Sequence, residues 1–198
     1  MARSLNRKVI ATIGFAVAVL ATGCAGALYK VKPAADLPAL PSSAKSADAG
    51  GTVVRVAPLL TDEESQQLFE ANLPLSGLLP VRIELSYETG VVPLELKRVR
   101  FRLRDGEGRE WKMLAPKQAV SRILKANGVY VYNPNSRKQF EKEFTAYAID
   151  LKTPLPASER RRQGFLFFQT PKKEPVASPH GLVLTVEGLA QPATITIN

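Results

Sequence analysis

Residues 99–114 read VRFRLRDGEGREWKML, and they predict two antiparallel strands joined by a tight turn. In the first half, every second residue is apolar and the residues between are arginines. Successive side chains of a strand point to opposite faces, so this period of two indicates one buried face and one wet face. The Asp-Gly-Glu-Gly run at 105–108 is typical of a hairpin turn, and residues 110–114 supply the returning strand.

The arginines of this hairpin and a second run farther along form the strongest charge feature of the chain. We expect the first group to share one sheet face and the second to lie in a loop. One interpretation is a patch for an anionic partner, such as lipid head groups, glycan phosphates or an acidic protein. The other is a solvated face whose charge resists aggregation, and it is favoured because acids such as Glu84, Glu88 and Glu110 are available to pair with the arginines. The candidate residues are Arg98, Arg100, Arg102, Arg104, Arg160, Arg161 and Arg162.

Outward from the hairpin, β-branched and aromatic runs predict further short strands. These strands span residues 52–56, 81–87, 164–168, 182–186 and 193–197. The strand at 81–87 alternates apolar with polar residues, so we expect it to be half-buried. Aromatic residues dominate burial, so we assign those of the strands to the core rather than to a ligand cavity. They are Phe165, Phe167, Phe168, Trp111 and Tyr87.

Three short helices are predicted from capping signals. Thr61 and Glu64 have the spacing of a capping box and start the first helix. Pro116 suits the first turn of a second helix, which Asn127 and Gly128 end. A third helix is expected from Ser136, because Ser136 and Gln139 have the same capping-box spacing. Its apolar face is formed by Phe140, Phe144 and Tyr147.

Several short strands separated by Gly and Pro turns favour a β-sandwich. The layout over roughly residues 68–168 resembles the immunoglobulin-like domains of bacterial envelope lipoproteins of unassigned function. The resemblance is carried by GLLPV at 77–81, VRFRLRD at 99–105 and GFLFF at 164–168. It implies a mainly β, immunoglobulin-like β-sandwich with two or three short inserted helices, and it implies no activity.

The first residues predict an exported lipoprotein. A basic start, an apolar run at 9–20 and a small-residue exit are typical of a secretory signal. The sequence Ala21-Thr22-Gly23-Cys24 resembles the lipobox of bacterial lipoproteins, which implies cleavage between Gly23 and Cys24 and a diacylglyceryl thioether on Cys24. Cys24 is the only cysteine, so no disulfide competes for it. The alternative is an uncleaved helix that continues to residue 29, which is nearly long enough to span a bilayer.

The chain therefore divides into a signal peptide at 1–23, a lipidated flexible tether at 24–51 and a domain at 52–198. The tether is rich in Ala, Pro, Ser and Gly, and buries too little apolar surface to fold alone. Ala25, in place of Asp, implies by the same resemblance an outer-membrane location that faces the periplasm or the cell surface. The whole chain carries a formal charge of +9, and removing the three bases of the signal leaves +6. This charge favours anionic surfaces, and nucleic acid is a poor partner for an exported protein.

The chain offers few groups for catalysis. His180 is the only histidine and lies in a Pro-His-Gly loop, and Cys24 is expected to carry lipid. A zinc site needs several His or Cys ligands, so we expect no metal, no cofactor and no catalytic residue. The function we expect is a non-enzymatic binding or scaffolding module, anchored in the envelope membrane, with an unidentified partner. The alternatives are an envelope hydrolase with an unrecognised site and a carrier of an apolar ligand.

Overall fold

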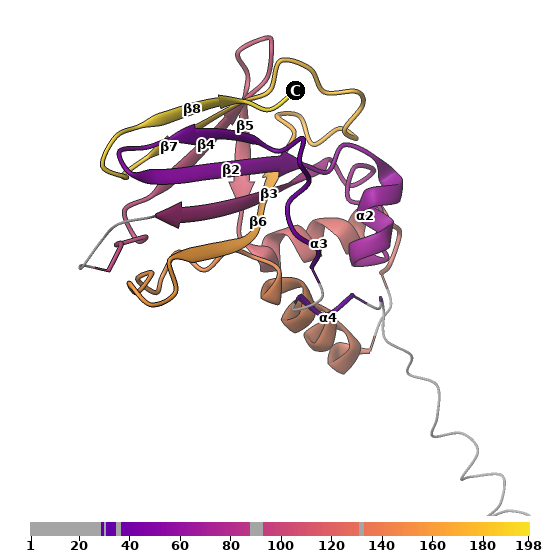
Figure 1. Cartoon of the computed structure of the whole chain (residues 1–198). Helices are drawn as coiled ribbons and strands as arrows, with labels where there is room; N and C mark the ends of the chain where they lie inside the picture. The colour runs from indigo at the N-terminus through magenta and orange to yellow at the C-terminus, as the bar shows by residue number, and fades with distance from the viewer. Residues whose placement is uncertain (1–28, 30, 35–36, 88–92, 131–132) are drawn as a thin grey trace, which may run out of the picture.

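The computed structural model describes residues 29, 31–34, 37–87, 93–130 and 133–198. Within these residues, antiparallel strands form one sheet in the order β1-β2-β3-β6-β5-β4-β7-β8, with the helices gathered on one side of it (Figure 1). The strands are β1 Lys45–Asp48, β2 Thr52–Pro58, β3 Leu78–Tyr87, β4 Arg100–Arg104, β5 Glu110–Leu114, β6 Arg161–Gln169, β7 Val183–Glu187 and β8 Ala193–Thr196. The helices are α2 Asp62–Phe69, α3 Pro116–Ala126 and α4 Pro134–Ala146.

The sheet curls until its two ends nearly meet. Gln191 N, just before β8, donates to Ala49 O, just after β1, at 3.2 Å. The prediction of a mainly β fold is confirmed, but one barrel-like sheet stands in place of the two separate sheets of a sandwich. The reason is that β5 pairs with β4 through Leu103 and Trp111 and also pairs with β6, so the two halves stay joined.

Two apolar clusters lie on the two faces of this sheet. One fills the inside of the curl, and the other lies between the outside of β3, β5 and β6 and the helices. Along β6, Leu166 and Phe168 point to the inner cluster, whereas Phe165 and Phe167 point to the helices. All of the aromatic side chains assigned to the core are buried, which confirms that prediction.

Strand β3 is buried on both faces, so the predicted wet face is wrong. Arg82 and Glu84 are only 6% and 4% exposed. The segment before β1 crosses this face, and the Arg82 guanidinium donates to the carbonyls of Pro38 and Ala39. Glu84 forms an ion pair with Arg161 at 3.0 Å. The period-two pattern shows which residues are polar, but it cannot show that another segment of the chain packs over them. The sequence misleads here for this reason.

The helices follow their capping signals at two of three starts. Thr61 caps α2, and the Thr61 N–H donates to the Glu64 carboxylate in return, which completes the predicted box. Pro116 opens α3, which ends at Asn127. The predicted start of the third helix at Ser136 is wrong, because Asn133 caps α4 three residues earlier and Pro134 occupies its first turn. Phe140, Phe144 and Tyr147 are buried as expected.

The folded body begins earlier than Thr52. Strand β1, Lys45–Asp48, pairs with β2 inside the stretch predicted as a flexible tether. Farther upstream, the Tyr29 ring packs on Phe140 with centroids 4.9 Å apart, and Lys32 N donates to Leu68 O at 3.2 Å. The tether prediction is therefore wrong for these residues, because their few apolar groups find a partner surface on the helices.

The signal peptide, Gly23 and Cys24 lie outside the described residues. Among the residues that are described, no helix combines the length and the apolar character that a membrane crossing requires.

Candidate functional site

The sheet opens between β4 and β5. Strand β4 pairs with β7 along its whole length, but its described pairing with β5 covers only Leu103–Trp111 and Arg104–Glu110. Beyond Trp111, β5 turns to pair with β6 through Lys112, Met113 and Leu114. The N-terminal part of β4 and the C-terminal part of β5 therefore diverge. We call the opening between them the split.

The floor of the split is apolar. Met113 pairs with Phe168, whose side chain belongs to the inner cluster, so Met113 also points inward. Its side chain is nevertheless 40% exposed, whereas the inward residues Trp111 and Phe101 are each 5% exposed. An inward residue becomes accessible only where the sheet does not close over it. The split therefore gives solvent a path to part of the inner face.

Two cavities meet at Met113. One has a volume of about 560 Å³ and lies between β4 and β5, where Arg100, Phe101 and Arg102 face Lys112 and Met113. The other has a volume of about 490 Å³ and is mainly apolar. It runs from Met113 under the end of β5 to the loop after α4, and its lining includes Ile149, Leu151, Leu166 and Phe167. Because Met113 lines both cavities, we treat the two together as the candidate binding groove.

The outer rim of the split is cationic. Arg100 and Arg102 alternate with buried residues on β4 and point outward, and Lys112 points outward from β5. The Arg102 guanidinium lies 3.7 Å from Glu187, and both side chains are about half exposed. Solvent weakens such an exposed pair. With Glu110 paired to Arg104 at the closed end, the rim carries the three cations Arg100, Arg102 and Lys112 and one acid, Glu187, beside Arg102.

The structure does not gather the seven candidate arginines into one patch. Arg100, Arg102 and Arg104 share the outer face of β4, as predicted, but Arg98 lies in the turn before the strand. Of the acids expected opposite them, Glu110 lies 3.9 Å from Arg104, and Glu84 lies instead on β3. Glu88 lies outside the described residues.

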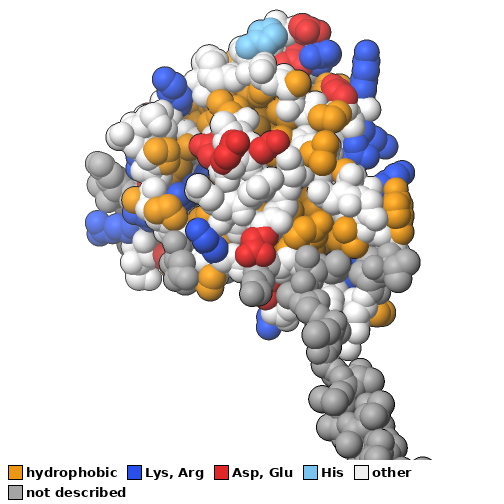
Figure 2. All heavy atoms as spheres, turned by 90° about the vertical axis from the view of Figure 1, so that its right-hand side faces the viewer, with side chains coloured by type: hydrophobic (Ala, Val, Ile, Leu, Met, Phe, Trp, Pro, Cys, Tyr) orange, Lys and Arg blue, Asp and Glu red, His pale blue; other side chains and the backbone are white. Residues whose placement is uncertain are grey.

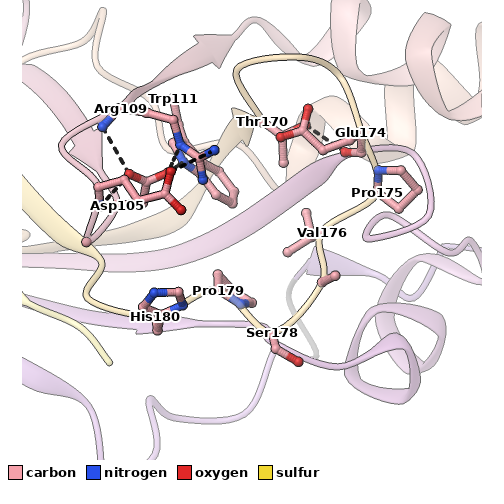
Figure 3. Close-up of a pocket in the computed structure, with 13 residues that line it drawn as sticks. Asp105, Arg109, Trp111, Thr170, Glu174, Pro175, Val176, Ser178, Pro179 and His180 are labelled. Carbon is pink, nitrogen blue, oxygen red and sulfur yellow. Dashed lines mark hydrogen bonds and ion pairs between the residues drawn. The ribbon is translucent and has the colours of Figure 1, made fainter.

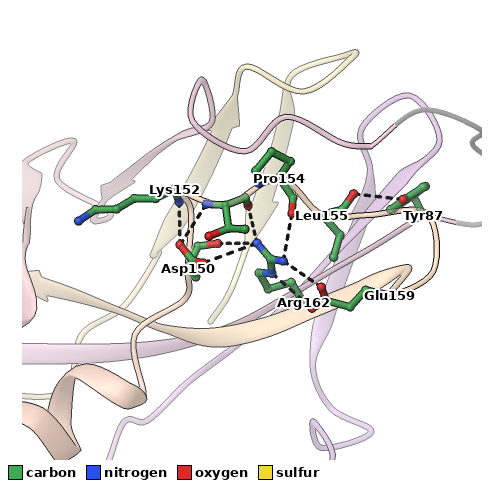
Figure 4. A network of polar contacts seen from close by, with 8 residues as sticks. Tyr87, Asp150, Lys152, Pro154, Leu155, Glu159 and Arg162 are labelled. Carbon is green, nitrogen blue, oxygen red and sulfur yellow. Dashed lines mark hydrogen bonds and ion pairs between the residues drawn. The ribbon is translucent and has the colours of Figure 1, made fainter.

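The second arginine run is divided by β6. Arg160 is an exposed turn residue with a φ of 51°, and Arg161 and Arg162 are the first residues of the strand, on opposite faces. Arg162 is 11% exposed and donates to the carbonyls of Asp150, Thr153 and Pro154, as Figure 4 shows. It also pairs with Glu159 at 2.9 Å. Its contacts hold the loop after α4, so Arg162 has a structural role.

A smaller pocket of about 260 Å³ lies beside the hairpin turn (Figure 3). Asp105, Arg109 and Trp111 form one side, and the loop that carries Glu174 and His180 forms the other. Burial opposes the charge on Asp105, but hydrogen bonds from Trp111 and from Arg109, with the Arg109 charge, outweigh it and lower the pKa of the Asp105 carboxyl to about 2. Asp105 is therefore an ionised acceptor with four donors, and it has no capacity left to act as a base.

The remaining groups of this pocket do not converge on a reacting centre. His180 is exposed, and its backbone carbonyl accepts from Gly106 N at 3.1 Å. Glu174 Oε2 is buried without a hydrogen-bond partner among the described protein atoms. No group of three or more His, Cys, Asp or Glu side chains within the described ranges is placed to hold a metal. The arrangement stabilises a turn and offers no nucleophile paired with a base.

Charge is mixed over the face of the molecule that Figure 2 presents. Lys and Arg side chains lie mainly toward the edges of this view, acidic side chains lie near its middle and at its top, and hydrophobic side chains are scattered between them. This face therefore carries no continuous basic patch. Arg100, Arg102 and Lys112 border the cavity between β4 and β5, and Lys152 borders the apolar cavity beside it.

Sequence analysis missed Met113 and the role of Trp111 in the split. The alternation of side chains along the hairpin places both residues on the inner face. Their residue types, however, give no sign that β5 changes its pairing partner after Trp111. The one local signal is that Met, an adaptable apolar residue, stands where a β-branched core residue is more common. Comparisons of the chain with protein-family models, with curated proteins and with solved structures gave no match.

Proposed function

We propose that this protein is a non-enzymatic binding module of the bacterial cell envelope, held on the membrane by lipid on Cys24, and that the split between β4 and β5 is its binding site. The observation that carries the proposal is the exposed inward side chain of Met113 between a cationic rim and an apolar cavity. Binding sites are mostly apolar with a few placed polar groups, and the apolar cavity next to Met113, bordered by the charged residues of the split, has that composition.

The membrane part of the proposal rests on the sequence. The basic start, the apolar run and the lipobox-like Ala21-Thr22-Gly23-Cys24 support export, cleavage and lipidation. Two acyl chains or more give stable attachment. By the resemblance of Ala25, the outer membrane is the location that we propose, and a protein or anionic surface of the envelope is the partner.

The test is crosslinking in cells from a chosen position. A photoreactive amino acid replaces Met113, and the control replaces Leu75, an exposed apolar residue outside the split. We expect discrete adducts from position 113 and none of the same mass from position 75. The adducts are expected to decrease in the Cys24→Ser variant, whose product moves to the soluble fraction. Identical patterns from the two positions, or no adduct from 113, overturn the binding site.

A second candidate function is the carriage of an apolar ligand. The specific observation that favours it is the 490 Å³ volume of the apolar cavity, which exceeds the roughly 300 Å³ of a small ligand site. Titration of the protein with oleate, followed by the fluorescence of Trp111, tests this candidate. If the protein carries an acyl ligand, we expect a saturable change in fluorescence, and we expect Met113→Lys to weaken or abolish that change.

A further inference from the structure

The hydrogen-bond ladder between β4 and β5 stops one rung short of Phe101. Asp105 N donates to Arg109 O at 3.1 Å, and Leu103 pairs with Trp111 in the same register. In an antiparallel ladder, alternate residues carry the bonds to one neighbour. The next such rung would join Phe101 to Met113, and the described pairing does not include it.

Both residues therefore present backbone groups to the split. The N–H and C=O of a strand residue point to the same side, and residues two apart point alike. The backbone N–H and C=O of Phe101 point the same way as those of Leu103, toward β5. Those of Met113 point the same way as those of Trp111, toward β4. Unpaired strand edges of this kind accept an added strand, whose main-chain bonds provide affinity.

The side chains around the split specify what such a strand would carry. On the inner side it would meet Phe101 and Met113, which are apolar. On the outer side it would lie between Arg100 and Arg102 of β4 and Lys112 of β5, beyond the closed end where Glu110 pairs with Arg104. Opposite charges on neighbouring strands stabilise a sheet, and like charges destabilise it. An inserted segment therefore fits when an apolar residue stands between two acidic residues.

We propose that the split binds an extended segment of a partner protein, which adds as a strand between β4 and β5 and alternates acidic with apolar side chains. The inference rests on the proposed binding function and names the class of partner that this site takes. A peptide fits better than an acyl chain, because an acyl chain leaves the backbone groups of Phe101 and Met113 without partners. The 560 Å³ cavity between the strands provides the space.

The test measures amide protection in the split. The lipidated full chain is placed in lipid nanodiscs and incubated with a peptide of about six residues, in which glutamate alternates with valine. Hydrogen–deuterium exchange with fragmentation then reports single amides. We expect the peptide to slow exchange of the Phe101 and Met113 amides at least about tenfold. A peptide with the same residues in two blocks, and an N-methylated alternating peptide, are expected to have no effect.

Two sets of variants test the side-chain requirements. The double change Arg100→Gln and Arg102→Gln is expected to weaken binding of the alternating peptide about tenfold. The matched control is Arg104→Gln, which removes a charge from the same face where β4 and β5 remain paired. Met113→Lys places a charge on the inner side of the split and is expected to abolish binding of the peptide. Because Met113 is already 40% exposed, the melting temperature is expected to stay near that of the wild type.

Three results overturn the proposal. The first is protection of the Phe101 and Met113 amides without peptide, equal to that of paired β4 amides, because the ladder would then be closed in solution. The second is peptide binding without slower exchange at these amides. The third is protection by oleate and not by peptide. In each case, crosslinks from position 113 in cells decide separately whether the binding function itself survives.

Discussion

Trp111 donates its indole N–H to Asp105 Oδ2 at 3.1 Å, across the hairpin and directly above the split. Asp105 Oδ2 also accepts from Arg109 Nε at 2.9 Å, and its Oδ1 accepts from two backbone amides of the turn. One carboxylate thus fixes the turn and the ring of the last residue that β4 and β5 share. These hydrogen bonds hold the closed end of the split, where β4 and β5 remain paired.

Asp105→Asn is expected to destabilise the protein by about 2 kcal/mol, because an amide points donors at the donors of Trp111 and Arg109 and removes the charge that strengthens these bonds. Urea unfolding measures the loss. Glu107→Gln is the control: Glu107 lies in the same turn and pairs with Arg109, but its side chain is 61% exposed. Exposed pairs contribute little, so a change within about 0.5 kcal/mol is expected. Equal losses in both variants would contradict the special role of Asp105.

Stability is expected to fall as the pH drops from about 5 toward 2. The pKa of Asp105 is about 2 in the fold, below the value near 3.9 of an unfolded Asp. The pKa of Asp150 is lowered as well, first by its hydrogen bond from the Thr153 side chain. The unfolded state therefore binds more protons in this range, and protonation favours unfolding. Melting temperatures across this range measure the effect, and Asp105→Asn is expected to give a shallower decline; an unchanged slope speaks against the assignment.

Local signals in the sequence predicted local structure well. The turn at 105–108, the capping box of Thr61 and Glu64, and Pro116 at the start of α3 all formed as expected. Each of these features is decided by residues within a few positions of one another, so the sequence contains the whole cause. The failure at Ser136 has the same origin, since two local signals competed and Asn133-Pro134 was the stronger start.

Features that depend on distant segments could not be predicted in this way. Arg82 and Glu84 read as solvent-facing, but residues that precede β1 cover Arg82, and Arg161 pairs with Glu84. The split depends on the change of partner by β5 after Trp111, which no residue type announces. Of the predicted arginine patch, the β4 face kept its arrangement and the run at 160–162 did not, because β6 begins inside that run.

Arg162→Met is expected to cost about 2–3 kcal/mol of stability and to leave binding at the split unchanged. The substitution removes a side chain that is only 11% exposed, and it leaves the carbonyls of Asp150, Thr153 and Pro154 without their charged donor. Arg160→Met, at an exposed turn position, is the control, and thermal unfolding compares the two. If both variants kept wild-type stability while losing partner crosslinks, the arginine run would be a binding surface after all.

The Lys32 amide is expected to exchange slowly with deuterium in the folded protein, although it lies in a stretch that reads as a flexible tether. Its N–H donates to Leu68 O, and the Lys32 carbonyl accepts from the Tyr147 hydroxyl. Exchange of this hydrogen-bonded amide must wait for the segment to detach. Tyr147→Phe removes one of the two bonds, worth about 1 kcal/mol, and should speed exchange of the Lys32 amide about fivefold. Hydrogen–deuterium exchange with fragmentation measures the rate, and the Lys152 amide, in a separate loop, serves as the internal reference. Exchange of the Lys32 amide at the rate of an unstructured peptide in the wild type would support the tether prediction for this segment.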